Sequence, residues 1–164
     1  MENKEQLSVF GAGPKLFIIT LAFFIITFIL NSLYKELFLI NIVSRSIQIS
    51  IGIILLITGL TLHIICGKTI LEVYKQDILY TSGVFKICRH PMYSAWIFFN
   101  LPGIALLLGS WILLTIPVIM YIIFRLLIKT EEKYLEKRYP DDYKNYIKET
   151  SLVFPCIWNV LKKN

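Results

Sequence analysis

Charged residues and cysteines are scarce in this sequence. Asp, Glu, Lys and Arg make up 17% of its 164 residues, whereas hydrophobic residues make up 56%. A typical soluble domain carries about 25% charged residues, so the composition argues against a soluble protein. The apolar residues are also unevenly distributed, which indicates discrete membrane-embedded segments rather than an ordinary globular core.

The cysteine pattern excludes two further classes of protein. The chain has three cysteines, Cys66, Cys88 and Cys156. They all fall on the side of the spans that is predicted to be cytoplasmic, where no disulfide framework is expected, and their spacing matches no metal-ligand motif. We expect them to act as small apolar residues and predict no metal site.

Four hydrophobic blocks predict the fold class. Each approaches the roughly 20 residues that a helix needs to cross the hydrocarbon core of a bilayer. We therefore expect an all-α polytopic membrane protein with about four transmembrane helices, forming a single domain over residues 1–164. The predicted spans are residues 16–34, 47–66, 92–108 and 111–128, leaving a polar connector at 67–91 and a polar tail at 129–164.

Two familiar patterns are missing near the start of the chain. No small-residue cleavage pattern follows the first block, which we interpret as a retained helix rather than a signal peptide. The run from Gly11 to Pro14 lacks the third spaced glycine of a dinucleotide-binding loop. It predicts a flexible entry into the first helix.

The cations gather on one side of the predicted spans. The net charge is +6, but the opposite side holds only Lys35 and Arg45. The positive-inside rule therefore places both termini and the 67–91 connector in the cytoplasm. This distribution suits attraction to anionic membrane lipids and argues against nucleic acid as a partner.

Several residues within the spans are chemically informative. The small and hydroxyl residues of the second span predict close helix packing and a central position for that helix. His63 on that span is interpretable as a ligand, a proton carrier or a hydrogen-bonded structural residue. Pro102 and Pro117 predict kinks in the hairpin of the third and fourth spans. Arg125 is an ionisable residue in an apolar run, which makes it a functional candidate, although its side chain is near enough to the surface to snorkel.

The polar segments predict additional helices at the membrane surface. Hydrophobic residues between 70 and 80 alternate with charges and indicate a short interfacial helix. In the tail, a second helix is expected from Asp141, with Tyr143, Tyr146 and Ile147 on one face. The fold class therefore includes cytoplasmic interfacial helices beside the four spans.

Two separated motifs resemble a known family. The segment TSGVFKICRHPMY, residues 81–93, precedes the hydrophobic hairpin, and TEEKYLEKRYPDDYKNY, residues 130–146, follows it. In this order they resemble the isoprenylcysteine carboxyl methyltransferase and phospholipid methyltransferase superfamily of integral membrane enzymes. The resemblance implies methyl transfer from S-adenosylmethionine to a lipophilic acceptor in the membrane.

The resemblance also implies a set of site residues. The connector, the RHPMY pentapeptide and the glutamates after the hairpin would enclose the cofactor on the cytoplasmic side. Glu132, or a neutral His90, would be the candidate base for an amine acceptor, and Arg125 a candidate contact for a carboxylate acceptor. The cofactor-binding residues so implied are Asp77, Ile78, Leu79, Tyr80, Phe85, Arg89, His90, Pro91, Met92, Tyr93 and Glu131.

Departures from the family pattern keep the acceptor open. Family members that act on a prenylcysteine carboxylate place an arginine about one turn before the glutamates, where this chain has Leu127. An isoprenylcysteine-type carboxylate, a phospholipid amine and another small lipophile all stay candidates. Two further classes are compatible with the pattern, an NADPH-dependent enzyme resembling sterol reductases and a non-catalytic membrane scaffold. No protein partner is inferable.

Overall fold

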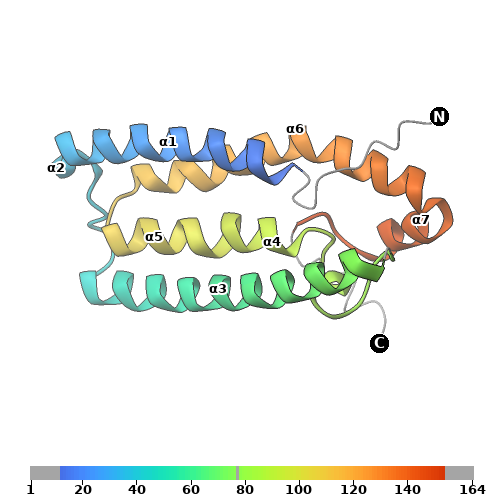
Figure 1. The fold of residues 1–164 in the computed structure, drawn as a ribbon. Helices are drawn as coiled ribbons and strands as arrows, with labels where there is room; N and C mark the ends of the chain where they lie inside the picture. Colours follow the sequence, from blue (N-terminus) through green and yellow to red (C-terminus); the bar gives the residue numbers. More distant parts are fainter. Residues whose placement is uncertain (1–11, 77, 154–164) are drawn as a thin grey trace.

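The computed structural model describes residues 12–76 and 78–153, with side-chain detail omitted for 72–76. Almost all of this part is helical, which confirms the all-α prediction (Figure 1). The elements are α1 (Gly13–Leu33), α2 (Lys35–Phe38), α3 (Arg45–Gln76), the 3₁₀ helix η1 (Gly83–Lys86), α4 (Pro91–Ser94), the π-helix η2 (Ala95–Asn100), α5 (Leu101–Leu108), the 3₁₀ helix η3 (Ile112–Leu114), α6 (Thr115–Arg138) and α7 (Pro140–Glu149).

Four helical stretches of the described chain are long and apolar enough to cross a membrane. They cover residues 13–33, 45–71, 91–108 and 112–138, close to the four predicted spans. The protein is therefore an integral membrane protein. The second stretch differs most from its prediction, because α3 continues through Gly67 to Gln76 as one helix. The separate interfacial helix expected between residues 70 and 80 is wrong for this reason.

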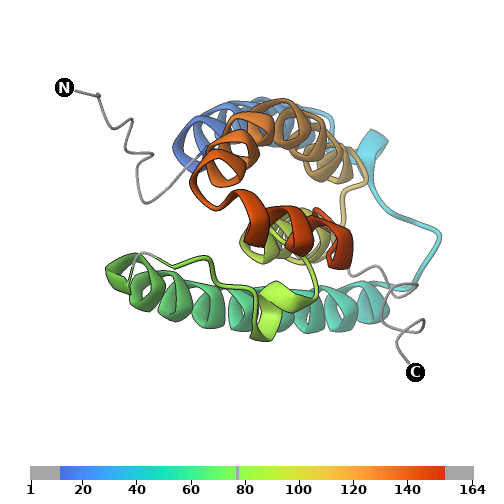
Figure 2. The ribbon, with the colours of Figure 1, turned by 90° about the vertical axis from the view of Figure 1, so that its right-hand side faces the viewer.

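The helices form three layers. The continuous rod α4–η2–α5 lies in the middle, with α3 on one side and the pair α1 and α6 on the other (Figure 2). The rod is also the most buried of the four spans. The prediction that the second span is the central helix is therefore wrong. Its small residues serve close packing against the rod, and its other faces carry exposed isoleucines and leucines.

Glycines set the contact between α3 and the rod. A Cβ added to Gly59 would lie 1.9 Å from Oδ1 of Asn100, and one added to Gly52 would lie 3.0 Å from the Gly103 carbonyl. Only a residue without a side chain lets the two backbones approach this closely. The predicted role of small residues on this helix is confirmed.

The two prolines of the hairpin behave differently. Pro102 has no N–H for the carbonyl four residues earlier, and the π-helix η2 ends two residues before it. Pro117 lies in the first turn of α6, where an intrahelical donor is not required. The helix is therefore irregular just before Pro102, and Pro117 lies at the start of a helix rather than interrupting one, while the predicted kinks stay a prediction.

The hairpin turn is closed by contacts with the α1–α3 connection. Gly109 adopts a left-handed conformation with φ of 69° directly after α5. Arg45 donates to the carbonyl of Leu106 at 3.0 Å and also to that of Leu107, at the C-terminal end of α5. Trp111 donates its indole N–H to the Leu37 carbonyl at 3.1 Å. These bonds fasten the end of the bundle opposite to the RHPMY segment.

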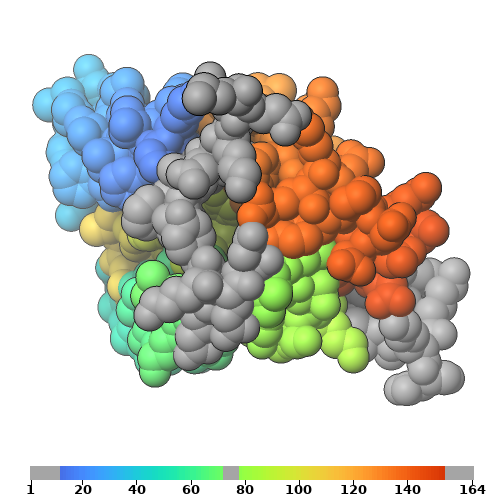
Figure 3. Space-filling model, turned by 45° about the vertical axis from the view of Figure 1, so that its right-hand side comes forward, coloured from blue at the N-terminus to red at the C-terminus, as the bar shows by residue number. Residues whose placement is uncertain are grey.

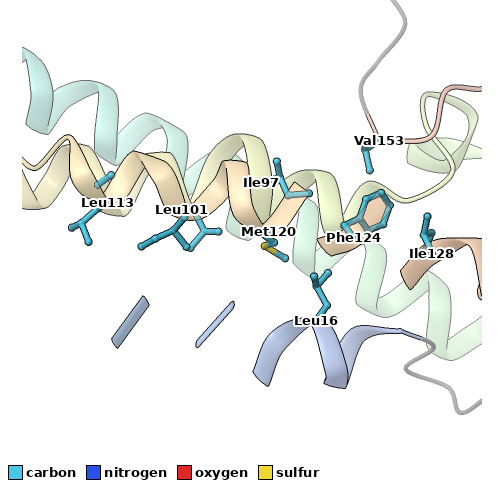
Figure 4. Packing of buried hydrophobic residues seen from close by; sticks show 10 residues of the cluster. Leu16, Ile97, Leu101, Leu113, Met120, Phe124, Ile128 and Val153 are labelled. Carbon is cyan, nitrogen blue, oxygen red and sulfur yellow. The ribbon is translucent and has the colours of Figure 1, made fainter. Parts of the chain in front are cut away.

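A core cluster joins the rod to α1 and α6. Leu16, Ile97, Met120 and Phe124 are each at most 5% exposed. Figure 4 shows Leu16 projecting from α1 toward Met120, and Val153 close to Phe124. The core therefore extends to the end of the bundle where His90 lies, and gives that end a rigid base.

Candidate functional site

An ion pair joins the segment before α4 to the far end of α6. Nε and Nη2 of Arg89 both lie 2.9 Å from Oε1 of Glu132. The Arg89 side chain is only 11% exposed, and its Nη1 donates to the Thr150 carbonyl at 2.6 Å. Arg89 thus connects three segments of the protein through contacts within the chain.

His90 lies between the two glutamates. Its Nδ1 is 3.9 Å from Oε1 of Glu131, and its Nε2 is 3.9 Å from Oε1 of Glu132. Among the residues that the structure describes, Nε2 is buried without a hydrogen-bond partner. The structure therefore brings together His90 and both glutamates, which are 41 and 42 positions later in the sequence.

The start of α1 also reaches this cluster. The Ala12 backbone N–H donates to Oε2 of Glu131 at 3.2 Å, and a Cβ on Gly13 would lie 3.6 Å from the Tyr93 hydroxyl. A carboxylate is favourable at a helix N-terminus, where backbone N–H groups are otherwise unpaired. The sequence analysis missed this contact, since it treated the Gly11–Pro14 run only as a helix entry. The sequence signal for a helix N-terminus at this point was the pair Gly13 and Pro14.

The segment after α7 runs alongside the RHPMY segment. The backbone N–H groups of Arg89 and His90 donate to the carbonyls of Ser151 and Leu152, at 2.9 and 3.0 Å. The Ser94 hydroxyl donates to the Val153 carbonyl. These bonds fix the backbone of His90 and determine where its ring points.

Two tyrosines of α7 complete the cluster. Tyr143 donates to Oε1 of Glu132 at 3.2 Å, and Tyr146 donates to the Phe85 carbonyl at 2.5 Å. Burial raises the pKa of both hydroxyls, and the negative charge of Glu132 raises that of Tyr143 further. Both tyrosines therefore stay protonated donors at neutral pH. The predicted helix with these two residues on one face is confirmed.

An aromatic group surrounds the inner side of His90. The ring centroids of Tyr93 and Phe124 are 4.9 Å apart, and each lies within 6 Å of the His90 ring. Pro91 occupies the first position of α4, where a missing N–H costs the helix nothing. The polar ring of His90 thus packs against an aromatic wall formed by Tyr93 and Phe124.

Residues 78–85 of the connector lie at the same end of the bundle as His90, and Phe85 meets the cluster through its carbonyl, which accepts from Tyr146. The rings of Tyr80 and Phe85 meet edge to face at 5.8 Å, Leu79 is half-buried and Ile78 is exposed. Figure 3 shows this part of the chain, in light green, next to α6 and α7 in orange. No contact between residues 78–80 and the His90 cluster is described, and Asp77 lies outside the described residues.

Arg125 is placed differently from the other candidates. It lies on α6 beside the buried Phe124, but its own side chain is exposed. Within the described chain it forms no ion pair, and it does not meet His90 or the glutamates. Leu127, which occupies the family's arginine position, is half-buried against the core. Arg125 lies on the same stripe of α6 as Glu132, but the seven residues between them correspond to about 10 Å along the helix at 1.5 Å per residue, so it is set apart from the His90 cluster by distance along α6.

A cavity adjoins the aromatic wall. Its volume is about 270 Å³, and it lies between α1, the rod and α6. Tyr93 and Gly13 are at the end nearest His90. The other lining residues are Leu16, Phe17, Thr20, Leu21, Phe24, Met92, Trp96, Leu101, Ile104 and Met120.

His63 lies on the other side of the rod from this cavity. Its Nδ1 is 2.8 Å from the Gly59 carbonyl, and its ring meets that of Trp96 at 5.2 Å. The Asn100 side chain is 3.4 Å away. These contacts favour the interpretation of His63 as a hydrogen-bonded structural residue.

Cys66 and Cys88 form no disulfide, and both are buried.

Comparisons with known proteins place the chain among methyltransferases. The family model for phospholipid methyltransferases matches residues 46–142. The chain is 31% identical over 96 residues to a protein-S-isoprenylcysteine O-methyltransferase of Schizosaccharomyces pombe, which covers 58% of this chain and 39% of that protein. It is 32% identical over 85 residues to the cobalt-zinc-cadmium resistance protein CzcN of Cupriavidus metallidurans, covering 49% and 37%.

The length of these matches is limited. The chain spans less than two fifths of the length of either curated relative. No solved structure gives a significant match. The residues that the family model matches nevertheless contain the first motif, all but the last four residues of the second, and the central residues of the cluster, Arg89, His90, Glu131 and Glu132.

Proposed function

Because the chain belongs to the phospholipid methyltransferase family, we propose that it transfers a methyl group from S-adenosylmethionine to a lipophilic acceptor in the bilayer. One observation carries the proposal: His90 lies 3.9 Å from both Glu131 and Glu132, and the neighbouring Tyr93 lines an apolar cavity. A polar cluster suits a water-soluble cofactor, and the cavity suits a greasy acceptor. The site combines both kinds of surface within a few residues.

The cluster has the donor and acceptor groups that this cofactor requires. The Glu131 carboxylate can accept from a ribose diol or an amino group, and the unpartnered Nε2 of His90 can bind a carboxylate or an adenine nitrogen. Tyr93 and Phe124 offer ring faces to a cation, at about 0.5 to 2 kcal/mol each. Bound S-adenosylmethionine would supply an electrophilic methyl group on a positively charged sulfur.

The glutamates have different roles in this proposal. Oε1 of Glu132 already accepts from Arg89 and Tyr143, so Glu132 mainly holds the site together. With an amine acceptor the unprotonated Nε2 of His90 would be the better base, and only with an acceptor that requires no base is Nε2–H available to hold the cofactor. A carboxylate acceptor requires no base. Arg125 is exposed and outside the cluster, and we propose no contact between it and the acceptor.

Alignment and exclusion of water provide the rate enhancement in such a site. Correct orientation of two reactants is worth about 7 to 11 kcal/mol. The contacts of Arg89, Tyr143 and the tail fix His90, while the apolar cavity holds the acceptor on the opposite side of the Tyr93 ring. We therefore propose that the bilayer supplies the acceptor laterally, and that the polar end of the bundle faces the cytoplasm.

The decisive experiment is a transfer assay with the purified protein in lipid. Labelled S-adenosylmethionine is offered with a total lipid extract and with prenylcysteine analogues, and the product is identified by mass. We expect a labelled lipophile with the wild type and, at a subsaturating donor concentration, about tenfold less or lower with His90→Ala. Thermal shifts with S-adenosylhomocysteine and with NADPH run beside it, and stabilisation by NADPH alone would overturn the proposal.

A further inference from the structure

The end of the bundle opposite to the His90 cluster holds an open pocket. It lies where α2, the start of α3 and the end of α5 come together, at the left of Figure 1, and its volume is about 330 Å³. Lys35 and Arg45 both line it. They are the only lysine and arginine in residues 16–67 and 91–124. The two cations at this end of the protein therefore share one site, which we call the basic pocket.

The guanidinium of Arg45 is held in place by the protein. Its Nη1 donates to Oε1 of Gln48 at 3.2 Å and to the Leu106 carbonyl at 3.0 Å, and its Nη2 donates to the Leu107 carbonyl. A Cβ on Gly109 would lie 2.7 Å from Nη1, so only glycine leaves room for the guanidinium here. These partners are neutral, and they use three of the five N–H groups of arginine. Among the described contacts, the charge and two N–H groups stay available to a ligand.

A buried amide fixes the wall of the basic pocket. Gln48 is 3% exposed, and its Nε2 donates to the carbonyls of Ile40 at 2.8 Å and Val43 at 2.7 Å. The Ile40 N–H in turn donates to the Gly109 carbonyl at 3.0 Å. The loop between α2 and α3 is thus held against the hairpin turn. A ligand would enter a preformed site and spend little of its binding energy on ordering the loop.

The charge of the basic pocket indicates an anionic ligand. Neither Lys35 nor Arg45 forms an ion pair within the part of the chain that the structure describes. Glu36 follows Lys35 on α2, but no acidic residue lines the pocket. Arginine and lysine are the side chains that bind phosphate oxygens most strongly. The ligand class that suits the site is therefore a phosphate.

The surroundings of the basic pocket indicate that the phosphate belongs to a lipid. Three helices long enough to cross a membrane begin or end here, at Leu33, Arg45 and Leu108, so the pocket lies at the membrane surface. Beside it Ile42 is 96% exposed and Val43 is partly exposed. Water solvates such side chains poorly, whereas acyl chains cover them. A free phosphate ion would leave them in water.

We propose that the basic pocket binds the headgroup phosphate of an anionic glycerophospholipid. The phosphate would accept from the Lys35 ammonium and from the free N–H groups of Arg45, while the acyl chains cover Ile42. A zwitterionic headgroup would bring its ammonium near the same two cations, with no carboxylate in the lining to pair with it, so a lipid of net negative charge is preferred. This site is separate from the His90 cluster, and the inference does not depend on methyl transfer.

The test compares two photoreactive lipids and uses the protein in nanodiscs of phosphatidylcholine. Both probes have a diazirine beside the ester group of one acyl chain. One is a phosphatidylglycerol and the other a phosphatidylcholine. After irradiation and peptic digestion, which does not depend on Lys35, mass spectrometry measures the labelling of residues 34–48 and 106–112 at equal probe fractions. No methyl donor is present.

We expect the phosphatidylglycerol probe to label these residues of the wild type about three- to tenfold more, between the effect of an exposed ion pair and that of a charge-assisted hydrogen bond. Lys35→Gln should remove most of this preference, and Lys35→Arg should keep it. Lys35 is varied because Arg45 also closes the hairpin. Lys133→Gln is the matched control, since it removes an exposed lysine at the other end of the bundle, and it should keep the wild-type preference. Equal labelling of the wild type by both probes, or an unchanged preference in Lys35→Gln, would overturn the proposal.

Millimolar inorganic phosphate separates a lipid from a soluble anion. It should leave the labelling by phosphatidylglycerol unchanged, because a free ion does not cover the apolar side chains beside the pocket. Suppression of the labelling would assign the pocket to a soluble anion and would overturn the lipid assignment.

Unfolding temperatures in neutral detergent complete the test. Lys35 has no described partner, so Lys35→Gln without added lipid should unfold at the wild-type temperature. Added phosphatidylglycerol should raise the unfolding temperature of the wild type more than that of the variant, because a ligand stabilises the state that it binds. A lower unfolding temperature of the variant without lipid would mean that Lys35 acts within the protein, and would contradict the proposal.

Discussion

Arg89 and Glu132 form an ion pair in which two guanidinium nitrogens lie 2.9 Å from one carboxylate oxygen. The pair joins the segment before α4 to the C-terminal part of α6, which we propose faces the cytoplasm. Because Arg89 also donates to the Thr150 carbonyl, one side chain connects three segments. Its loss should affect the stability of the whole end of the bundle.

Arg89→Gln should lower the free energy of unfolding by about 1.5 to 3 kcal/mol, the usual contribution of charge-assisted hydrogen bonds. Unfolding in a detergent titration, followed by tryptophan fluorescence, measures it. Arg125→Gln is the control, since Arg125 is exposed and unpaired within the described chain, and it should stay within about 0.5 kcal/mol of wild type. Equal losses in the two variants would refute the structural role of Arg89.

His90→Ala and Glu131→Ala should each weaken the binding of S-adenosylhomocysteine by about tenfold or more, because each removes a group from the proposed cofactor site. Calorimetry in detergent provides the affinity, and the unfolding temperature of each variant shows that the protein is folded. Glu136→Ala changes an exposed carboxylate on the same helix and should bind as the wild type does. Unchanged affinity in both site variants would remove them from the site.

Gly59→Ala should destabilise the protein by about 1 to 3 kcal/mol, because the new methyl group would lie 1.9 Å from the Asn100 amide oxygen. Gly67→Ala on the same helix has no atom within 4 Å of the new methyl group. It should be neutral or stabilising by up to about 1 kcal/mol, from the higher helix propensity of alanine. A chemical denaturation series of both variants tests this, and similar effects at the two glycines would contradict the packing of α3 on the rod.

Cys88 should resist alkylation in the native protein. It is 4% exposed, and burial raises the pKa of its thiol, so the reactive thiolate is scarcer at pH 8 than for an exposed cysteine. Iodoacetamide labelling followed by peptide mapping should show little modification of Cys88 before denaturation and complete modification after it. Rapid native labelling would mean that the tail segment opens readily above this residue.

Much of the fold follows from the hydrophobic blocks of the sequence. The four spans and the tail helix were predictable because length and apolar periodicity are local properties. The end of α3 was not predictable in this way. A glycine such as Gly67 costs a helix only about 1 kcal/mol, and α3 continues past it to Gln76. The central position of the rod also depends on packing between helices, which the small residues of α3 indicate without specifying which helix is inside.

The candidate site was predictable only in part. Motif resemblance identified His90, Glu131 and Glu132, and their proximity agrees with that prediction without testing their roles. The contacts of Ala12, Tyr143 and Ser151 with the cluster join residues far apart in the chain, and no local pattern encodes them. Arg125 shows the opposite error. The sequence singled it out as a charge within an apolar run, but the structure leaves its side chain exposed and apart from the His90 cluster.

The pairing of Ser151 and Leu152 with Arg89 and His90 has a consequence for biosynthesis. A chain is made from its N-terminus, and all four spans can enter the membrane before these two residues leave the ribosome. A nascent protein would thus be inserted while His90 still lacks its backbone partners. A released chain truncated before Ser151 should therefore be membrane-anchored but unable to retain cofactor, because His90 lacks these backbone partners.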